Sequence, residues 1–99
     1  MNAADPDGAA RGAARSAGPF RYRADVLIEL QRHGVCPTSR NSPDVVRGYV
    51  RELYKFEIRT LRERYLRKEF PKREYADRVD QLRRRYPVLA LLPDQFLGP

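Results

Sequence analysis

His33 and Cys36 have the spacing of two ligands for one metal ion. They are also the single histidine and the single cysteine of the chain. Zinc in proteins takes about four ligands, or about three and a water molecule, so acidic side chains would have to complete such a site. The sequence therefore predicts no metal site and no cofactor. We expect His33 to complement the negative end of a helix dipole, and Cys36 to be a loop or packing residue.

Glu57 lies among apolar residues in the middle of a helical pattern, where an unpaired carboxylate would be costly to bury. We expect a partner on a neighbouring helix, and Arg83 or a near neighbour would lie opposite if the two helices are antiparallel. The alternative is a catalytic carboxylate, but no second acid, histidine or nucleophile is predicted beside it. The chain also lacks a glycine-rich phosphate loop, a nucleophile elbow and paired catalytic acids. The sequence predicts no enzymatic activity and no catalytic residues.

A stripe of basic residues is the sharpest surface feature of the sequence. Its members follow one another at intervals of three or four positions and share one broad face of a predicted helix. Adjacent like charges cost at most about 0.5 kcal/mol per pair, and a helix selected only for stability would tend to avoid them. The stripe is a candidate face for a polyanion or an acidic partner, and the alternative is a solvated face whose charges meet acidic side chains elsewhere. The candidate residues are Arg47, Arg51, Lys55, Arg59 and Arg62.

The helix that carries this stripe has a clear start signal. Ser42 can cap the free backbone N–H groups, Pro43 suits the first helical position, and Asp44 complements the positive end of the dipole. The helical pattern then continues to about residue 69. Its apolar stripe consists of Val46, Tyr49, Val50, Leu53, Tyr54, Ile58, Leu61 and Tyr65.

A shorter helix is predicted before it, over residues 22–33. Its apolar residues Tyr22, Val26 and Leu30 recur every four positions. Gly34 suits the left-handed position that follows a last helical turn, and the next residue could fold back onto the helix.

A third helix is predicted over residues 71–85, between Pro71 and Pro87. Almost no loop separates it from the long helix, so the two should form an antiparallel hairpin. The first helix would cover the groove between them. The expected hairpin core is Leu53, Ile58, Leu61, Val79 and Leu82.

The 99 residues allow one small domain. Residues 1–19 contain seven Ala, three Gly and two Pro and cannot bury enough surface to offset their ordering entropy, so we expect a disordered tail. Residues 20–99 are expected to form a single small all-α domain of three helices, built on the long-helix antiparallel hairpin. Residues 88–99 are apolar and interrupted by Pro93, and are expected either to dock on the helices or to bind a partner.

Charge and cysteine content restrict the partners and the compartment. The net charge is +7, which favours acidic partners such as nucleic acid, anionic lipid or an acidic protein face. One cysteine cannot form an intramolecular disulfide, and no apolar run approaches the roughly 20 residues that span a bilayer. The N-terminus has no hydrophobic leader region. These features predict a cytoplasmic protein of bacterial type.

Residues 61–82 combine a leucine-bearing helix, a short turn with an apolar residue, an acidic–aromatic pair and a second leucine-bearing arm. The residues of this pattern are Leu61, Leu66, Phe70, Glu74, Tyr75 and Leu82. The pattern resembles the SHOCT domain, a short helical hairpin at the C-terminus of many bacterial proteins. Glu69 stands in place of the family's turn glycine, and Pro71 in place of its usual threonine. The resemblance implies no enzymatic activity and an assembly or tethering role.

The first hypothesis for function is a small non-enzymatic interaction protein, an adaptor or regulatory subunit, that binds another protein or a second copy of itself. Its aromatic side chains exceed the needs of so small a core. The alternative is a protein that binds nucleic acid non-specifically through the basic face. A third possibility is attachment to an anionic membrane surface through arginine-rich helices and the apolar end. No small-molecule substrate is implied.

Overall fold

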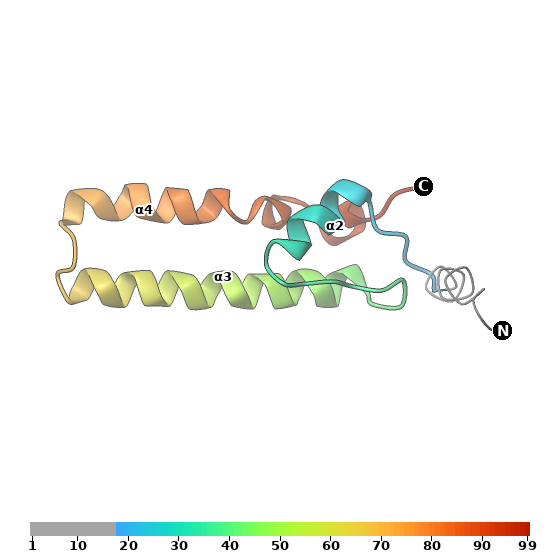
Figure 1. The fold of residues 1–99 in the computed structure, drawn as a ribbon, viewed down its shortest axis with the longest axis horizontal. Helices are drawn as coiled ribbons and strands as arrows, with labels where there is room; N and C mark the ends of the chain where they lie inside the picture. Colours follow the sequence, from blue (N-terminus) through green and yellow to red (C-terminus); the bar gives the residue numbers. More distant parts are fainter. Residues whose placement is uncertain (1–17) are drawn as a thin grey trace, which may run out of the picture.

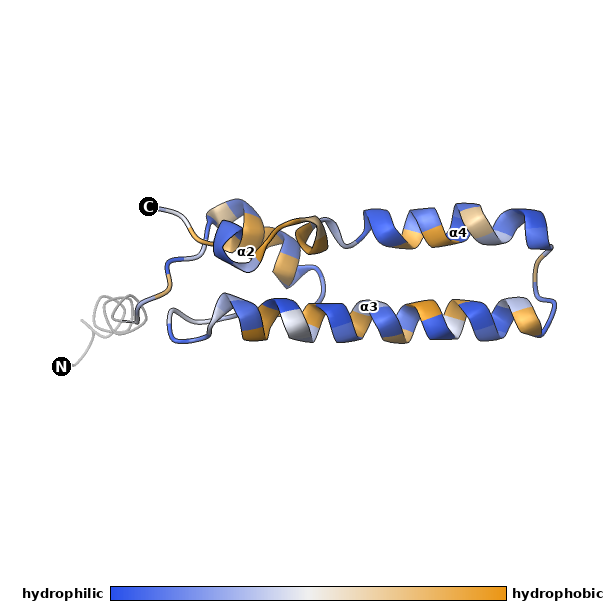
Figure 2. Cartoon of the chain, turned by 180° about the vertical axis from the view of Figure 1, so that it is seen from behind, coloured by the Kyte–Doolittle hydropathy of each residue, from blue (hydrophilic) through white to orange (hydrophobic). Residues whose placement is uncertain are grey.

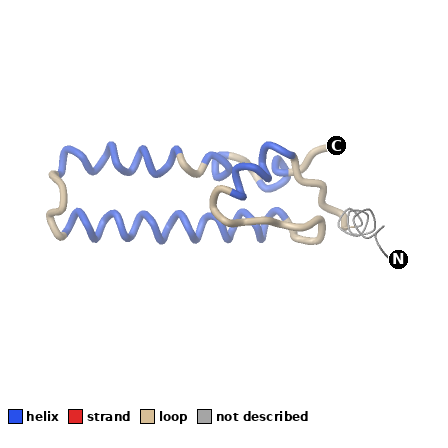
Figure 3. Tube along the Cα trace, in the orientation of Figure 1, coloured by secondary structure: helices blue, strands red, loops and turns tan. Residues whose placement is uncertain are grey.

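The computed structural model describes residues 18–99, which form α-helices and short 3₁₀ helices and contain no strand beyond one isolated bridge. Figures 1 and 3 show two long helices side by side as a hairpin, with the remaining elements gathered at its open end. The predicted all-α class, with three α-helices built on a long antiparallel hairpin, is confirmed for this part of the chain. The elements are α2 (Ala24–Gln31), α3 (Pro43–Leu66), α4 (Lys72–Arg84), η1 (Pro87–Ala90) and η2 (Pro93–Phe96).

The long helix α3 begins where its capping residues predict. The Ser42 hydroxyl accepts a hydrogen bond from the Asp44 N–H at 3.2 Å, and Pro43 is the first helical residue. Pro43 lacks the N–H group that would otherwise need a partner at this position. The start of the helix that carries the basic stripe is therefore set by local chemistry.

The same helix ends at Leu66, earlier than the predicted residue 69. Lys68 takes a left-handed φ of 62°, which stops the helical path. The Glu69 N–H then donates to the Arg64 carbonyl oxygen at 3.1 Å and closes the helix end. After this turn, α4 starts at Lys72 and runs back along α3.

The hairpin has a narrow apolar seam. Leu61 and Leu82 are buried between α3 and α4, as predicted. Leu53, Ile58 and Val79, the other members of the expected hairpin core, are only partly buried and pack against the buried residues. A pair of helices without a third along its groove leaves its seam residues partly open to solvent.

The best-sealed part of the core lies at the open end of the hairpin. Each of five apolar residues there is at most 2% exposed. They come from α2, from the first half of α3 and from the C-terminal segment, which is residues 88–99. Figure 2 shows apolar residues concentrated in α2 and this segment. The segment thus docks on the helices, which was one of its two expected roles. The five residues are Val26, Leu30, Val50, Val88 and Phe96.

Helix α2 does not cover the groove between α3 and α4, in contrast to the prediction. It packs against η1 at the open end, beyond the last turn of α4 (Figure 1). Its own end was predicted correctly, because Gly34 has a φ of 75° and the Val35 N–H donates back to the Leu30 carbonyl oxygen at 3.0 Å. The docked C-terminal segment supplies apolar surface at this end, and α2 buries its short apolar face there.

Tyr22 was predicted to belong to the first helix, but it forms an isolated antiparallel bridge with Leu97. The adjacent Arg23 N–H donates to the Phe96 carbonyl oxygen at 2.9 Å, so the chain is extended here and α2 begins at Ala24. Pairing with the C-terminal segment gives the Arg23 N–H a partner that the first turn of a longer helix would not have provided.

The expected disordered tail, residues 1–19, lies outside the described residues except for its last two. Gly18 donates its N–H to the Ser39 hydroxyl at 3.2 Å, and the Phe20 N–H donates to the Ser39 carbonyl oxygen at 2.9 Å. A β-carbon at position 18 would lie 2.3 Å from that carbonyl oxygen, so only glycine fits this approach. None of the helices in residues 18–99 has the length and apolarity needed to cross a bilayer.

Candidate interaction surface

His33 contacts the end of α4 and not the end of its own helix. Its Nε2 donates to the Arg85 carbonyl oxygen at 2.7 Å, and its ring stacks on Tyr86 with centroids 4.1 Å apart. Cys36 is exposed in the following loop. Within residues 18–99, no group of three or more His, Cys, Asp or Glu side chains is placed to hold a metal ion. The imidazole therefore joins α2 to the hairpin.

Glu57 is half-buried, and it has partners on the segment that faces α3. Its carboxylate forms an ion pair with Arg85 at 3.3 Å and accepts a hydrogen bond from the Tyr86 hydroxyl. Burial raises the pKa of Tyr86 well above its usual range, and the hydrogen bond to Glu57 adds to the effect. The expected partner Arg83 pairs instead with Asp80 at 3.9 Å. The structural reading of Glu57 is favoured, since these contacts join α3 to the end of α4.

Arg47, the first residue of the predicted basic stripe, is directed into the fold. Its Nε donates to the Leu91 carbonyl oxygen at 2.8 Å, and its Nη2 donates to the Leu89 carbonyl oxygen at 2.7 Å. Both carbonyls belong to the C-terminal segment, and the arginine is half-buried. Arg47 thus clamps this segment to α3 and is not part of an outward cationic face.

The other four candidates are exposed on α3, and we call them the basic strip. Lys55 pairs with Glu52 at 3.3 Å. Among the described residues, no ion pair engages the remaining three members, so most of the charge of the strip faces solvent. The basic strip consists of Arg51, Lys55, Arg59 and Arg62.

A second feature of the same helix is a row of exposed apolar side chains, which we call the apolar ridge. Val45 is 69% exposed, Tyr49 58% and Phe56 62%. Tyr49 was predicted to belong to the buried apolar stripe, and that prediction is wrong because its side chain faces solvent. Its neighbours Val46 and Val50 both point into the core, and Tyr49 lies beyond the edge of that face.

The ridge and the strip lie next to each other around α3. At about 100° per residue, the ridge positions fall within about 40° of one another, and the strip is centred about 100° further around the axis. The strip drifts by about 40° with each step of four residues, which is why its first member points inward and the rest point outward. The outer face of α3 therefore carries apolar side chains on one side and cationic side chains on the other, with the exposed carboxylate of Glu52 between them.

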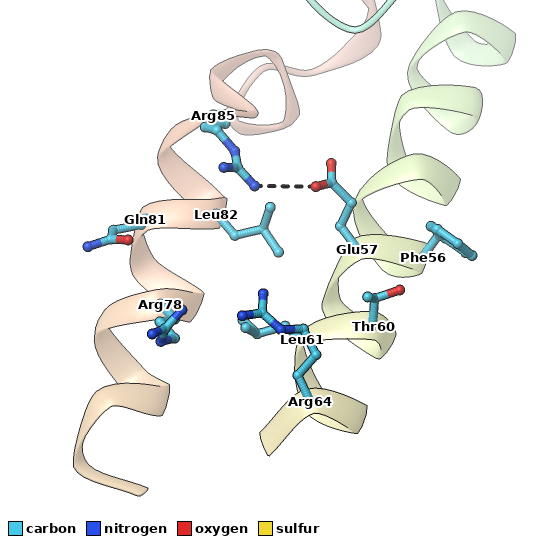
Figure 4. A pocket seen from close by; sticks show the side chains of 9 residues that line it. All are labelled: Phe56, Glu57, Thr60, Leu61, Arg64, Arg78, Gln81, Leu82 and Arg85. Carbon is cyan, nitrogen blue, oxygen red and sulfur yellow. Dashed lines mark hydrogen bonds and ion pairs between the residues drawn. The ribbon is translucent and has the colours of Figure 1, made fainter. Parts of the chain in front are cut away.

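Figure 4 shows the side chains that line a groove between α3 and α4, with the Phe56 ring at its border on the side of α3 turned away from α4. It has a volume of about 300 Å³. Leu61 and Leu82 form apolar walls, and the Glu57–Arg85 ion pair lies at one end of it. Phe56 borders the groove and is also part of the apolar ridge, so the ridge begins at the edge of the groove. The nine lining residues are Phe56, Glu57, Thr60, Leu61, Arg64, Arg78, Gln81, Leu82 and Arg85.

Sequence reasoning missed the ridge and the groove for different reasons. Val45, Tyr49 and Phe56 are spaced by four and seven positions, a helical period that could have been found as a second apolar face. The groove joins residues of α3 and α4 that no local pattern connects. Its composition depends on the register of the hairpin.

No known protein family, curated protein or solved structure matches this chain. The resemblance of residues 61–82 to the SHOCT hairpin stays a prediction.

Proposed function

We propose that this chain is a small non-enzymatic adaptor, which binds another protein through the outer face of α3. The observation that carries the proposal is the apolar ridge, whose three side chains are each more than half exposed on a helix whose opposite face already packs on the core. Burying one such side chain contributes about 1.5–3 kcal/mol. An exposed row of this kind marks a surface that gains free energy when a partner covers it.

Charge favours a different protein over a second copy of the chain. If a twofold axis paired Tyr49 of one copy with Phe56 of the other, Arg51 and Lys55 would meet their own counterparts within about one helical turn. Like charges so placed oppose association. A partner helix with an apolar row and an acidic flank meets both parts of the face. We place this interaction in a reducing compartment of bacterial cytoplasmic type, on the basis of the single cysteine.

The proposal is tested by photo-crosslinking in the native host. A photoreactive phenylalanine at position 49 should give one discrete protein adduct. The same group at Arg73, which is exposed on α4 away from the outer face of α3, is the control and should not give that adduct. The substitution Phe56→Ser should remove the adduct at position 49 while leaving the helix content unchanged. Equal adducts at both positions would contradict a specific interface.

Non-specific nucleic-acid binding is the second candidate, favoured by the solvent-facing charge of the basic strip. If four phosphates are neutralised, the logarithm of affinity should fall with the logarithm of salt with a slope of about −3 to −4. The double reversal Arg51→Glu with Arg59→Glu should flatten that slope, while leaving the melting temperature unchanged. If binding to the protein partner does not depend on salt, and binding to DNA and RNA is negligible at low salt, the nucleic-acid hypothesis is rejected and the adaptor hypothesis is retained.

A further inference from the structure

Two arginine side chains in the groove of Figure 4 share one aromatic ring. The guanidinium carbon of Arg78 lies 4.2 Å from the centroid of the Phe70 ring, and that of Arg64 lies 5.8 Å from it. Phe70 is itself buried in the turn between α3 and α4. Attraction between a cation and a fixed aromatic face holds each guanidinium in place before any ligand arrives. The groove therefore contains a pre-positioned cationic pair with one arginine from each helix.

Both arginines keep donors in reserve. Arg64 uses its Nε to bind Glu69 at 2.9 Å, and Arg78 uses one Nη to bind Glu74 at 3.2 Å. No hydrogen bond within residues 18–99 engages the Nη groups of Arg64 or the second Nη of Arg78. A guanidinium that holds one carboxylate through one nitrogen can still present others to a second anion.

The other walls of the groove select the kind of anion. Leu61 and Leu82 form apolar walls beside the cationic pair, and Phe56 borders the groove further along α3. The carboxylate of Glu57 lies at the end where it pairs with Arg85, and it would repel a long polyanion laid along the groove. A single anionic group attached to an apolar body meets all three features.

We propose that this groove binds a carboxylate carried on an apolar segment of the protein partner. The carboxylate bridges Arg64 and Arg78, and its apolar neighbours rest on Leu61 and Leu82. The choice of a protein segment as occupant rests on the proposed function, because the apolar ridge begins at the edge of the groove, at Phe56. The anion-binding chemistry is a property of the groove and can be measured without the partner.

The first experiment titrates the isotope-labelled full chain with phenylacetate, followed by nuclear magnetic resonance. The guanidinium Nη signals of Arg64 and Arg78 and the methyl signals of Leu61 and Leu82 should shift together and saturate. Phenylacetamide, which has the same shape without the charge, should leave the arginine signals unmoved, and Arg73 is an internal control. No saturable shift, or an equal response to phenylacetamide, would overturn the proposal. Tighter binding of phenyl phosphate or of a short mixed-sequence DNA duplex would also overturn it.

The second experiment distinguishes recognition by the planar donors of a guanidinium group from attraction to any positive charge. Arg78→Lys keeps the charge but loses the planar pair of donors, and should weaken phenylacetate by about tenfold. Arg64→Lys is a second variant in case the first is poorly folded, and Arg73→Lys is the matched control. Wild-type affinity in both groove variants, with wild-type circular dichroism, would overturn the bridging role.

The two proposals fail in different ways. If no protein adduct forms at position 49 but phenylacetate still binds, the adaptor proposal is overturned, and so is the proposal that a protein segment occupies the groove. A retained adduct with no phenylacetate binding would overturn the groove assignment alone. If both proposals are correct, phenylacetate should compete with the partner, and Arg78→Lys should lower the crosslinking yield.

Discussion

The two ends of the hairpin are built differently. At the open end, α2 and the C-terminal segment enclose α3 with apolar side chains that are almost fully buried, Val50 and Phe96 among them. The distal end has only α3 and α4, and its contacts are mainly aromatic rings and arginines. Tyr65 and Tyr75 lie 5.0 Å apart by ring centroid, and Arg78 lies over Phe70. One end is a sealed core, and the other is a thin hairpin with charged walls.

This difference assigns stability and binding to different parts of the molecule. Removal of apolar surface from water is the main source of folding free energy, so the open end should supply most of it. The distal hairpin exposes the groove, and Leu66 near its turn is 64% exposed. The apolar ridge spans the two regions, because Val45 lies at the open end and Phe56 at the groove.

Phe96→Ala should have the largest effect. The side chain is fully buried, and its removal should cost about 3–5 kcal/mol, a large part of the stability of a small domain. Denaturant unfolding measures the loss of free energy of unfolding. If the variant is already unfolded without denaturant, circular dichroism will show reduced helix content. Leu92→Ala is the control from the same segment, and should change stability by less than about 0.5 kcal/mol because Leu92 is 63% exposed.

Leu82→Ala tests the distal side of the comparison. Leu82 is buried in the hairpin seam, and its truncation should cost about 2–3 kcal/mol, the lower part of the usual range, because the surrounding wall is thin and can collapse. The same denaturant series gives the value. A loss greater than that of Phe96→Ala would reverse the assignment of stability to the open end.

Arg47→Ala and Arg51→Ala differ by one helical turn and should behave differently. Arg47 satisfies two backbone carbonyls of the C-terminal segment, and its removal should cost about 1.5–3 kcal/mol. Arg51 is exposed, and its removal should change stability by less than about 0.5 kcal/mol. Thermal and denaturant unfolding compare the pair. Equal losses would show that Arg47 does not hold the segment.

Glu57→Gln should cost about 1 kcal/mol, because the pair with Arg85 is partly solvent-screened while the hydrogen bond from Tyr86 is not. Glu57→Gln and Arg85→Met together should cost less than the sum of their separate losses, whereas Glu57→Gln and Arg83→Met should be additive. A double-mutant cycle by denaturant unfolding provides the measurement. Non-additive losses with Arg83→Met but not with Arg85→Met would contradict the observed pairing.

Tyr22→Phe removes the hydrogen bond from the Tyr22 hydroxyl to the Asn41 carbonyl oxygen at 2.6 Å and should cost at most about 1 kcal/mol at neutral pH, with a further measurable effect in alkali. Burial raises the pKa of Tyr22 to about 12, above the value of about 10 for an unfolded tyrosine. The folded state thus favours the neutral phenol, and the resulting stability is complete below about pH 10 and is lost as the pH rises towards 12. Melting temperatures across this interval should fall less steeply in Tyr22→Phe than in the wild type. Parallel curves would show that the phenol does not couple to folding.

The sequence by itself determined the elements whose causes are local. Ser42 and Pro43 start α3 through backbone groups within one turn, and Gly34 ends the preceding turn because it tolerates a left-handed φ. The position of the hairpin turn and the burial of Leu61 and Leu82 followed from helical spacing. Such features need no knowledge of what packs against them.

Only the tertiary structure decided the rest. The C-terminal segment has no helical or strand period to reveal its docking, yet its Leu89 and Leu91 carbonyls turn Arg47 inward. Glu57 met Arg85 and not Arg83, because a difference of two residues along the facing segment decides which charge lies opposite. Tyr49 is exposed because, in this part of α3, only the face that carries Val46 and Val50 packs on the core. Long-range packing settles each of these, since the free energy of a side chain depends on neighbours that lie far away in the chain.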